Sequence, residues 1–465
     1  MNRIFDRGLR FLASLRLAVV VIVGLAVISA IGTVYEARYD SEVATKLVYH
    51  SPYMYFILGL LVVNLVAVMV DRWPWKQHHA AFVLAHVGII VLLFGSWLTY
   101  RYGVDGSIAF EIGEERNTVT VKNRDLMVWA SLDGSSMANI YNAEVDFLVH
   151  PPTSERPFFV NLGSDELRFT EYQHFAFRES EIRASSAEED GPAVRFQLEN
   201  PNVNLTEWLR RERGQSQAQV DLGPARVVLA RDEASARSGG RNEIFLISTT
   251  DKKALEFIIY NKDKSIRKRG RIREAEMLET GWMGLKFRVL RYLPHATETI
   301  QYVPAKSASP LANSAAKFTM RGKEYWVGLN SALRLYLDDR AYYISYAHRQ
   351  LELGFPLRLK NFRVGTYQGT ERAASYESEV EVPGQGTVLV SMNEPLKHEG
   401  YTFYQASFQR DEQGRPVVSI LSVNYDPGRW LKYLGSLLIV LGSIMLFYFK
   451  RVKWIKKDSK KEIAA

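Results

Sequence analysis

Residues 80–100 read AAFVLAHVGIIVLLFGSWLTY, a run of 21 residues in which His86 is the one ionisable group inside the apolar stretch. A helix rises 1.5 Å per residue, so about 20 apolar residues cross the ~30 Å hydrocarbon core of a bilayer. The run therefore predicts a membrane-spanning helix, and this prediction sets the fold class of the chain.

Three further runs have the same character. Residues 17–34 and 433–449 carry no charge, and residues 54–70 contain Asn64 as their one strongly polar side chain. A single run fits a buried core helix equally well, but four runs flanked by Arg, Lys, Trp and Tyr favour membrane spans. We expect a membrane protein with four transmembrane helices, three N-terminal (17–34, 54–70 and 80–100) and one C-terminal (433–449).

The first run also resembles a signal peptide, because Arg3, Arg7 and Arg10 precede it. The run is long, however, no Ala-x-Ala site follows it, and two more spans come directly after it. These features differ from those of a cleaved leader. We interpret residues 17–34 as a retained helix.

Lys and Arg gather in the cytoplasmic loops of membrane proteins, and this bias predicts the orientation. Residues 1–16 contain four arginines, residues 71–79 contain two basic residues, and residues 450–465 contain seven. The loop 35–53 has two basic residues against three acidic ones. We expect the N-terminus, the loop 71–79 and the basic tail in the cytoplasm, with the loop 35–53 and the domain 101–428 outside.

The composition excludes several classes of protein. The net charge is +8, but residues 1–100 carry +3, residues 429–465 carry +7 and residues 101–428 carry −2. A nucleic-acid-binding domain needs a positive surface of its own, so this class is disfavoured. The chain has no cysteine, which excludes disulfide scaffolds, thiolate metal sites and thiol–disulfide exchange by this chain.

The segment 101–428 has the pattern of β structure. Apolar and polar side chains alternate, as in half-buried strands, at 194–198, 285–289 and 357–360. Turn-forming residues occur at 133–134, 190–192, 238–240 and 383–386. We expect a large extracytoplasmic, mostly-β, sandwich-like domain of one or two modules.

Three segments depart from this pattern. Residues 205–213, preceded by Asn204 in the N-cap position, predict a short helix, and residues 305–316, rich in Ala, Ser and Pro, predict a surface loop. Residues 262–273 carry seven Lys or Arg against Asp263 alone. We interpret this basic segment as a solvated hairpin, with a docking site for an acidic partner or lipid headgroups as the alternative.

His86 is the chemical clue within the spans. An ionisable side chain inside a membrane is costly and is a functional candidate by default. His86 lies seven residues into its helix from the cytoplasmic end, about 10 Å deep. Neutral imidazole is a good ligand for haem iron, zinc or copper. The alternative is a neutral histidine that hydrogen-bonds to a neighbouring helix.

His79 and Met69 are secondary ligand candidates. His79 precedes His86 by seven positions, which is about 10.5 Å along a helix. Two axial nitrogens of one iron lie roughly 4 Å apart on opposite sides of the metal, so one straight helix cannot supply both. No other span contains a histidine. If His86 binds haem iron in a bis-histidine site, the second ligand therefore comes from another chain. Met69 is a weaker internal candidate, and we interpret His78 and His79 as interfacial residues rather than ligands.

Small residues in the spans permit the close approach of a helix or a cofactor. They are Gly24, Gly88, Gly95, Gly435 and Gly442. Ordinary helix packing and cofactor binding explain them equally well.

Several motifs together resemble a known family. Residues 12–18 read LASLRLA, residues 79–89 read HAAFVLAHVGI, and residues 393–408 contain NEPL and GYTFYQASF before Asp-Pro-Gly at 426–428. In combination these motifs resemble the ResB (CcsB) proteins of System II cytochrome c biogenesis. The resemblance covers both membrane parts and the end of the external domain, whereas residues 120–380 match only in their β character.

The resemblance implies a ResB-like subunit of the System II cytochrome c synthetase, acting with a CcsA-type partner. The membrane is then a bacterial inner (cytoplasmic) membrane or a thylakoid, and we expect the bacterial one because no transit segment is evident. The pair would carry haem across the membrane and present it, with apocytochrome c, for covalent attachment at CxxCH. His86 occupies the position of the family's membrane haem ligand, so the expected cofactor is haem b shared with the partner. The chain is then not catalytic alone, and haem lyase activity belongs to the complex.

The sequence also suggests simpler roles for other motifs. We interpret residues 393–408 as an aromatic hairpin with a folding role, the alternative being transmission of ligand-dependent motion into the membrane, and residues 426–428 as a turn. The external histidines have no metal-type spacing, and we expect ordinary surface or core roles for His150, His174, His295, His348 and His398.

A function from a different class is a membrane-anchored extracytoplasmic scaffold or sensor without a cofactor. A transporter working alone is disfavoured, because four spans with one buried ionisable group offer little lining for a polar path.

Overall fold

We describe the chain from a computed structural model. The structure describes residues 3–131, 136–187, 190–223, 225–249, 254–337, 340–369, 373–411 and 414–462. The chain forms two compact units: Met1–Phe175 together with Ala305–Ala465, and Ala176–Pro304. The second unit is therefore an insertion in the sequence of the first.

The first unit begins and ends with helices. They are α1 (Arg3–Leu12), α2 (Leu15–Arg38), α3 (Ser41–Ala44), the π-helical turn η1 (Thr45–Tyr49), α4 (Pro52–Asp71), the 3₁₀ turn η2 (Gln77–His79), α5 (Ala80–Tyr102) and α6 (Arg429–Glu462). Four stretches are long and apolar enough to cross a membrane: Leu15–Arg38, Pro52–Asp71, Gln77–Tyr102 and Arg429–Tyr448. The predicted arrangement of three N-terminal spans and one C-terminal span is confirmed. Helix α6 continues past its span, so residues 450–462 of the predicted tail are helical.

Asn64, the strongly polar residue of the second span, has a structural partner. Its side chain is 3% exposed and its amide donates a hydrogen bond to the Leu12 carbonyl at 2.6 Å. The last carbonyls of a helix have no partner within that helix, so this bond satisfies the end of α1. Ser14 then caps the start of α2 by accepting from the Leu17 N–H at 3.2 Å. Asn64 therefore supports the break between α1 and α2.

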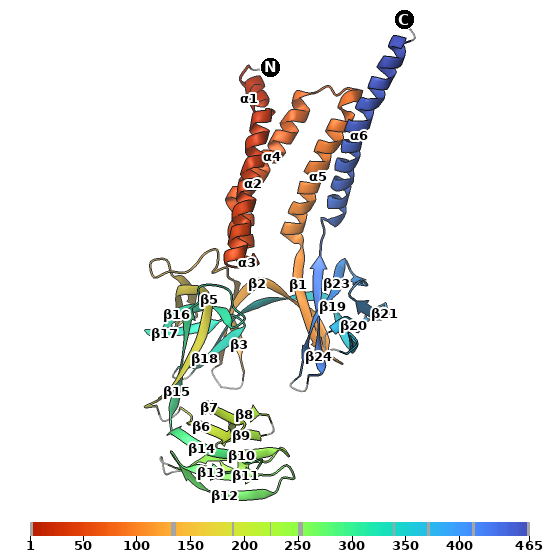
Figure 1. The fold of residues 1–465 in the computed structure, drawn as a ribbon. Coiled ribbons are helices and arrows are strands. Elements are labelled where there is room, and N and C mark those ends of the chain that lie inside the picture. The colour runs from red at the N-terminus through yellow and green to blue at the C-terminus, as the bar shows by residue number, and fades with distance from the viewer. Residues whose placement is uncertain are drawn as a thin grey trace. The chain divides into compact units, whose positions relative to one another are not determined.

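Helices α5 and α6 pack side by side through glycines (Figure 1). A Cβ added to Gly88 would lie 2.8 Å from the Gly435 carbonyl oxygen, and one added to Gly442 would lie 2.7 Å from the Ala85 nitrogen. Small residues allow this backbone contact, which maximises van der Waals packing between membrane helices. The predicted role of these glycines in close helix approach is confirmed, and Gly24 likewise faces Ile57 of α4.

A ten-stranded sheet follows the helices. Its strands are β1 (Val104–Glu111), β2 (Glu115–Ser131), β3 (Ala138–Glu144), β18 (Ser331–Leu337), β19 (Arg340–Thr366), β20 (Ala373–Val382), β21 (Gly386–Ser391), β22 (Leu396–His398), β23 (Tyr401–Arg410) and β24 (Pro416–Tyr425). The strand order is β21-β20-β19-β2-β1-β24-β23-β22, with β18 paired to β19 and β3 to β2. Phe110, Leu357, Phe403 and Val423 are buried in its core.

Helices α5 and α6 continue into strands β1 and β24 of this sheet, and we call these four elements the arm. Strand β1 follows α5 after one residue, Gly103, and β24 leads into α6 through the short turn 426–428 (Figure 1). These two strands pair antiparallel along their length, from Val104 opposite Tyr425 to Glu111 opposite Val418. The contact between α5 and α6 therefore continues as a strand pair without a flexible linker.

A smaller sheet completes the first unit. It contains β4 (Phe158–Asn161), the first half of β5 (Glu166–Ala184), β16 (Ala312–Met320) and β17 (Lys323–Gly328). Phe169 and Phe318 from this sheet share a buried cluster with Val128 and Tyr346 from the large sheet. The two sheets of the first unit thus share a core.

The second unit is a two-sheet sandwich with a two-stranded ribbon. One sheet has the order β12-β11-β10-β9-β8, the other β13-β14-β6-β7, and the second half of β5 pairs with β15. The strands are β6 (Ala193–Asn200), β7 (Val203–Arg210), β8 (Gln217–Leu222), β9 (Ala225–Ala230), β10 (Asn242–Ser248), β11 (Ala254–Tyr260), β12 (Ile266–Arg273), β13 (Met277–Glu279), β14 (Lys286–Leu293) and β15 (Ala296–Pro304), with a 3₁₀ turn η3 (Glu233–Ser235). Both sheets contribute to one buried cluster, for example through Phe196, Phe287, Leu246 and Phe257.

One local prediction is wrong and another is correct only in part. Residues 205–213 were predicted to be helical, but β7 covers most of them and pairs with β6 throughout. Leu205 and Leu209 are four positions apart, a spacing that places both on one face in a helix and in a strand alike. The predicted loop 305–316 is confirmed for residues 305–311 and wrong for residues 312–316, because β16 begins at Ala312 and buries Ala315 and Ala316.

Other local predictions have clear outcomes. The basic segment forms the turn and second strand of the β11–β12 hairpin, which confirms the predicted hairpin, with β12 at a sheet edge. The predicted turn at 383–386 lies between β20 and β21. The predicted turn at 133–134 lies outside the described residues.

Candidate functional site

His86 lies on α5, half-buried, two turns into the helix from its start. Its Nδ1 lies 2.9 Å from the carbonyl oxygen of Phe82. A carbonyl only accepts, so Nδ1 carries the proton and donates this bond. The neutral tautomer then leaves the Nε2 lone pair free, and within the described residues Nε2 has no protein partner. This is the arrangement of a metal-ligating histidine, whose second nitrogen is held by a carbonyl or carboxylate.

An aromatic ring and a cation lie against this imidazole. The Phe82 ring centroid is 3.8 Å from the His86 ring centroid, and the Arg72 guanidinium carbon is 4.0 Å from the Phe82 centroid. Phe82 therefore lies between Arg72 and His86, in contact with both. Arg72 follows the last residue of α4, so the stack joins the loop between α4 and α5 to the candidate ligand.

The structure separates the two secondary candidates from His86. His79 ends the 3₁₀ turn before α5, and its Nδ1 accepts from the Lys76 N–H at 3.3 Å. Met69 is buried in α4, and its carbonyl accepts from the Trp75 indole at 2.8 Å. In the described part of the chain, no hydrogen bond or ring contact connects either residue to His86. Their ligand roles stay predictions.

Helix α5 offers one candidate donor, the imidazole of His86. Across the described ranges, no group of three or more His, Asp or Glu side chains is arranged to hold a metal ion. A site with one ligand per chain fits a group shared between two polypeptides. It does not fit a structural zinc site, which needs four protein ligands.

A second cluster, missed at the sequence level, joins the α2–α4 connection to the large sheet. Arg124 of β2 is 2% exposed and donates to Glu42 of α3 at 2.7 Å. It also donates to the hydroxyl oxygens of Tyr172 at 2.6 Å and Tyr346 at 3.3 Å. The sequence signal was the polar run 122–125, which directly precedes the apolar run 126–130 in the same strand.

A histidine–carboxylate contact and one more ion pair reinforce this junction. His174 Nε2 lies 3.0 Å from Asp40 Oδ2, and its Nδ1 lies 3.1 Å from the Tyr172 hydroxyl. Lys46 pairs with Asp146 at 3.0 Å. His174 was predicted to have an ordinary role, and the structure places it in this junction, in contact with the α2–α4 connection.

Contacts within this junction shift the pKa values of Arg124 and His348. Burial opposes the charge of Arg124, but Tyr346, Tyr172 and Glu42 outweigh burial and hold the pKa of Arg124 above its ordinary value. Burial, followed by the charge of Arg124, lowers the pKa of His348. Arg124 is therefore a permanent buried cation, and His348 is neutral at neutral pH.

Asp426 connects the end of α5 to the start of α6. Its Oδ1 accepts from the Thr99 hydroxyl at 2.5 Å and its Oδ2 accepts from Lys432 at 2.7 Å. Burial raises the pKa of Asp426, but the hydrogen bonds from Lys432 and Thr99 and the charge of Arg429 lower it below the ordinary value. The predicted turn at 426–428 is confirmed, and Asp426 additionally links the two helices.

Residues 393–408 form the predicted aromatic hairpin. β22 pairs with β23, with Leu396 opposite Phe403, and Phe403 is fully buried. The side chain of Gln405 is held by the buried hydroxyls of Ser378 and Ser419. These contacts confirm the folding role; transmission of motion stays a prediction.

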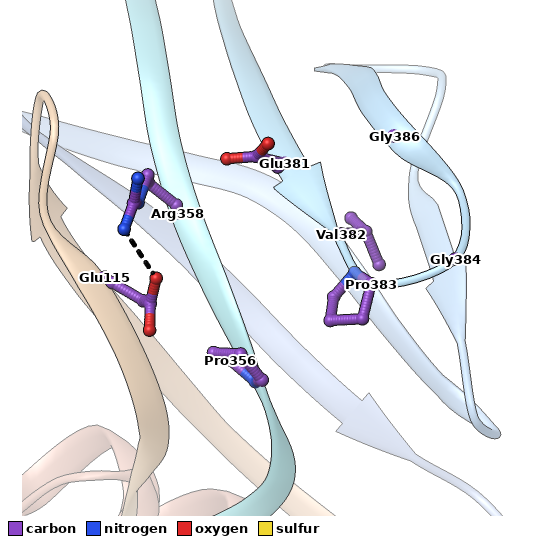
Figure 2. A pocket seen from close by; sticks show the side chains of 8 residues that line it. All are labelled: Glu115, Pro356, Arg358, Glu381, Val382, Pro383, Gly384 and Gly386. Atoms are coloured by element: carbon purple, nitrogen blue, oxygen red, sulfur yellow. Dashed lines mark hydrogen bonds and ion pairs between the residues drawn. The ribbon is translucent and has the colours of Figure 1, made fainter.

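A surface hollow of about 380 Å³ lies away from these clusters, at the β20–β21 turn (Figure 2). Its charges neutralise one another: Glu115 pairs with Arg358 at 2.8 Å, and Glu381 pairs with Lys360 at 2.8 Å. The hollow is lined by Glu115, Pro356, Arg358, Glu381, Val382, Pro383, Gly384 and Gly386. With no free charged group directed into it, the hollow does not define a ligand site.

Two comparisons with known proteins bear on this architecture. Residues 336–418 match the family model of the ResB-like family. Over 128 residues the chain is 36% identical to Protein NrfI of Wolinella succinogenes, a match that spans 26% of this chain and 14% of that relative. The family match covers β19 to β23 and includes the aromatic hairpin.

The fold and the candidate site define a class: a polytopic membrane protein with four apolar helices in its described residues, a large β domain and an imidazole within the apolar helix α5. Within that class, the segment 336–418 is similar to the ResB-like family, and the chain spans 14% of the length of its NrfI relative.

Proposed function

We propose that this chain is the ResB-like subunit of a cytochrome c synthetase and that it holds haem within the membrane. His86 supplies one axial ligand, and a CcsA-type partner supplies the other. Haem passes across the bilayer as cargo and is attached to apocytochrome c at CxxCH on the outer side. The haem lyase activity then belongs to the complex of the two subunits.

The observation that carries this proposal is the hydrogen bonding of the two ring nitrogens of His86. Its Nδ1 donates to the Phe82 carbonyl at 2.9 Å, so in the neutral ring Nε2 is unprotonated, and among the described residues it has no protein partner. An uncommitted imidazole in a span is costly unless it has a ligand or a partner. Haem iron takes a neutral imidazole as an axial ligand, and the single-donor site matches a group completed by a second chain.

The arm formed by α5, β1, β24 and α6 supports a link between the ligand and the β domain. His86 lies on α5, the helix that precedes β1. Asp426 links the end of α5 to the start of α6. A ligand-induced movement of α5 would therefore reach the sheet without passing through a loop. We propose that the β domain holds apocytochrome c close to this arm.

The orientation is part of the proposal. The basic N-terminus, the α4–α5 loop and the basic end of α6 face the cytoplasm, as the distribution of Lys and Arg favours. The β domain then lies outside a bacterial inner membrane, where c-type cytochromes are assembled.

A cellular experiment tests the proposal. The chromosomal copy is deleted, and the strain is complemented with the wild-type chain, with His86→Ala or with His79→Ala. Staining of membrane proteins for covalent haem should show c-type cytochromes lost on deletion, restored by wild type and His79→Ala, and absent or strongly reduced with His86→Ala. Normal c-type cytochromes in the deletion strain would overturn the proposal and leave the scaffold or sensor function.

A further inference from the structure

We propose that Arg72 binds a carboxylate of the porphyrin whose iron His86 ligates. This inference rests on the proposed function and adds a second contact to the same site. It assigns the negatively charged edge of the substrate to the end of α4 at the α4–α5 loop.

The geometry places the guanidinium close to the ligand. Because the Phe82 ring lies 4.0 Å from the Arg72 guanidinium carbon and 3.8 Å from the His86 ring, the guanidinium lies within about 8 Å of the imidazole. Phe82 and His86 are one turn apart on α5, whereas Arg72 comes from the end of α4. The two helices thus bring a cation and a metal-type imidazole to the same place from different parts of the chain.

The stacking leaves the hydrogen-bond donors of Arg72 free. A guanidinium that stacks on an aromatic ring uses its flat face, while its N–H groups point outward in its own plane. Those donors match a carboxylate in bidentate geometry. Within the described residues, Arg72 makes no ion pair, although Asp71 precedes it directly in the chain. Its charge is therefore available to a ligand.

The chemistry of the substrate requires such a group. Porphyrin carboxylates are ionised at neutral pH, and an unpaired carboxylate in hydrocarbon is costly. If the iron binds about two helical turns from the start of α5, the carboxylates are accommodated best towards the interface at that end. Arg72 is the cation there that contacts the residue stacked on His86, whereas the backbone N–H of Lys76 donates to His79.

A lipid phosphate is the competing anion, because basic residues at helix ends also contact headgroups. The two sources differ in one respect: esterifying the porphyrin carboxylates removes the first contact and leaves the second unchanged. The test therefore compares iron protoporphyrin IX with its dimethyl ester.

The complex of this chain and its membrane partner is purified in mild detergent and depleted of haem. Each porphyrin is titrated into the complex and binding is followed by absorbance. Wild type should bind the free acid about 10- to 100-fold more tightly than the diester, the effect of one charged hydrogen-bonded pair. Arg72→Gln should remove that preference and leave the low-spin spectrum unchanged, because the iron ligand is intact.

Arg101→Gln is the matched control. Arg101 lies at the opposite end of α5 and also contacts an aromatic ring, with its guanidinium carbon 5.4 Å from the Tyr102 centroid. It should keep the wild-type preference. Equal binding of acid and diester by wild type, or an unchanged preference in Arg72→Gln, would overturn the inference and assign Arg72 to lipid. Failure of the wild-type complex to bind either porphyrin would instead refute the proposed function.

Discussion

Gly88 of α5 and Gly435 of α6 lie so close that a Cβ on Gly88 would be 2.8 Å from the Gly435 carbonyl oxygen, and one on Gly435 would be 2.7 Å from that of Gly88. His86 is two residues before Gly88 on the same helix. The packing of α5 on α6 therefore fixes the position of the candidate ligand, and it fixes the strand pair that continues from the two helices.

The first prediction concerns this helix contact. Gly88→Leu should separate α5 from α6, because neither backbone can yield to a side chain at that distance, and overpacking of this kind costs about 1–3 kcal/mol. Thermal unfolding of the purified complex should show a lower midpoint. Gly59→Leu is the control, since Gly59 of α4 has no atom within 4 Å of an added Cβ. Equal midpoints for the two variants would contradict the packing account.

The second prediction concerns the buried cation of the junction. Arg124→Met should destabilise the β domain by about 3–5 kcal/mol, because it removes the buried cation that pairs with Glu42 and donates to two tyrosine hydroxyls. Denaturant unfolding followed by tryptophan fluorescence measures the change.

The control for this variant is Arg116→Gln, which removes an exposed pair with Glu114. Exposed ion pairs contribute about 0–1 kcal/mol, so the control should behave like wild type. Adding Glu42→Gln to Arg124→Met should recover part of the loss, since the partner left behind then carries no charge. An Arg124 variant as stable as the control would show that the junction is not a stabilising contact.

The third prediction is a pH dependence. Asp165 is almost fully buried, and hydrogen bonds from Arg321 and Tyr342, together with nearby arginine charge, outweigh burial and lower the pKa of Asp165 below its ordinary value. A carboxyl with a depressed folded-state pKa stabilises the protein above its unfolded pKa, near 3.9, and this stabilisation is lost as the pH falls through the folded value.

Asp165→Asn should therefore lower stability at pH 7 and flatten the stability profile below about pH 4. Asp105→Asn is the comparison, because its pair with Lys122 is exposed and long at 3.5 Å. Unfolding midpoints measured from pH 3 to pH 7 provide the check. Profiles for Asp165→Asn and wild type that run parallel across this range would show that the Asp165 pair does not contribute as described.

The membrane architecture could be predicted from sequence because hydrocarbon imposes a simple length and polarity rule. The glycines at 88, 95, 435 and 442 could also be recognised, because few residue types allow close packing of membrane helices. Asn64 could be flagged as unusual, but its partner is the carbonyl of Leu12, and only the packing of α1 against α4 reveals that bond.

Other features depend on contacts between distant segments. The insertion of the unit Ala176–Pro304 has no local marker, because its strands alternate like those of the first unit. The contact between Arg124 and Glu42 joins a strand to an interhelical loop, and no spacing rule brings them together. His86 could be selected from sequence alone; the Phe82 and Arg72 stack could not, because Arg72 belongs to another helix.

The central claim is that His86 ligates haem iron together with a second chain. Its most direct test is the absorption spectrum of the complex purified from membranes, with wild type compared with His86→Ala and His79→Ala, each with and without added imidazole. The account predicts a low-spin haem b spectrum in wild type and His79→Ala, its weakening or loss in His86→Ala, and partial recovery of that variant with imidazole. A colourless wild-type complex, or an unchanged spectrum in His86→Ala, would contradict it.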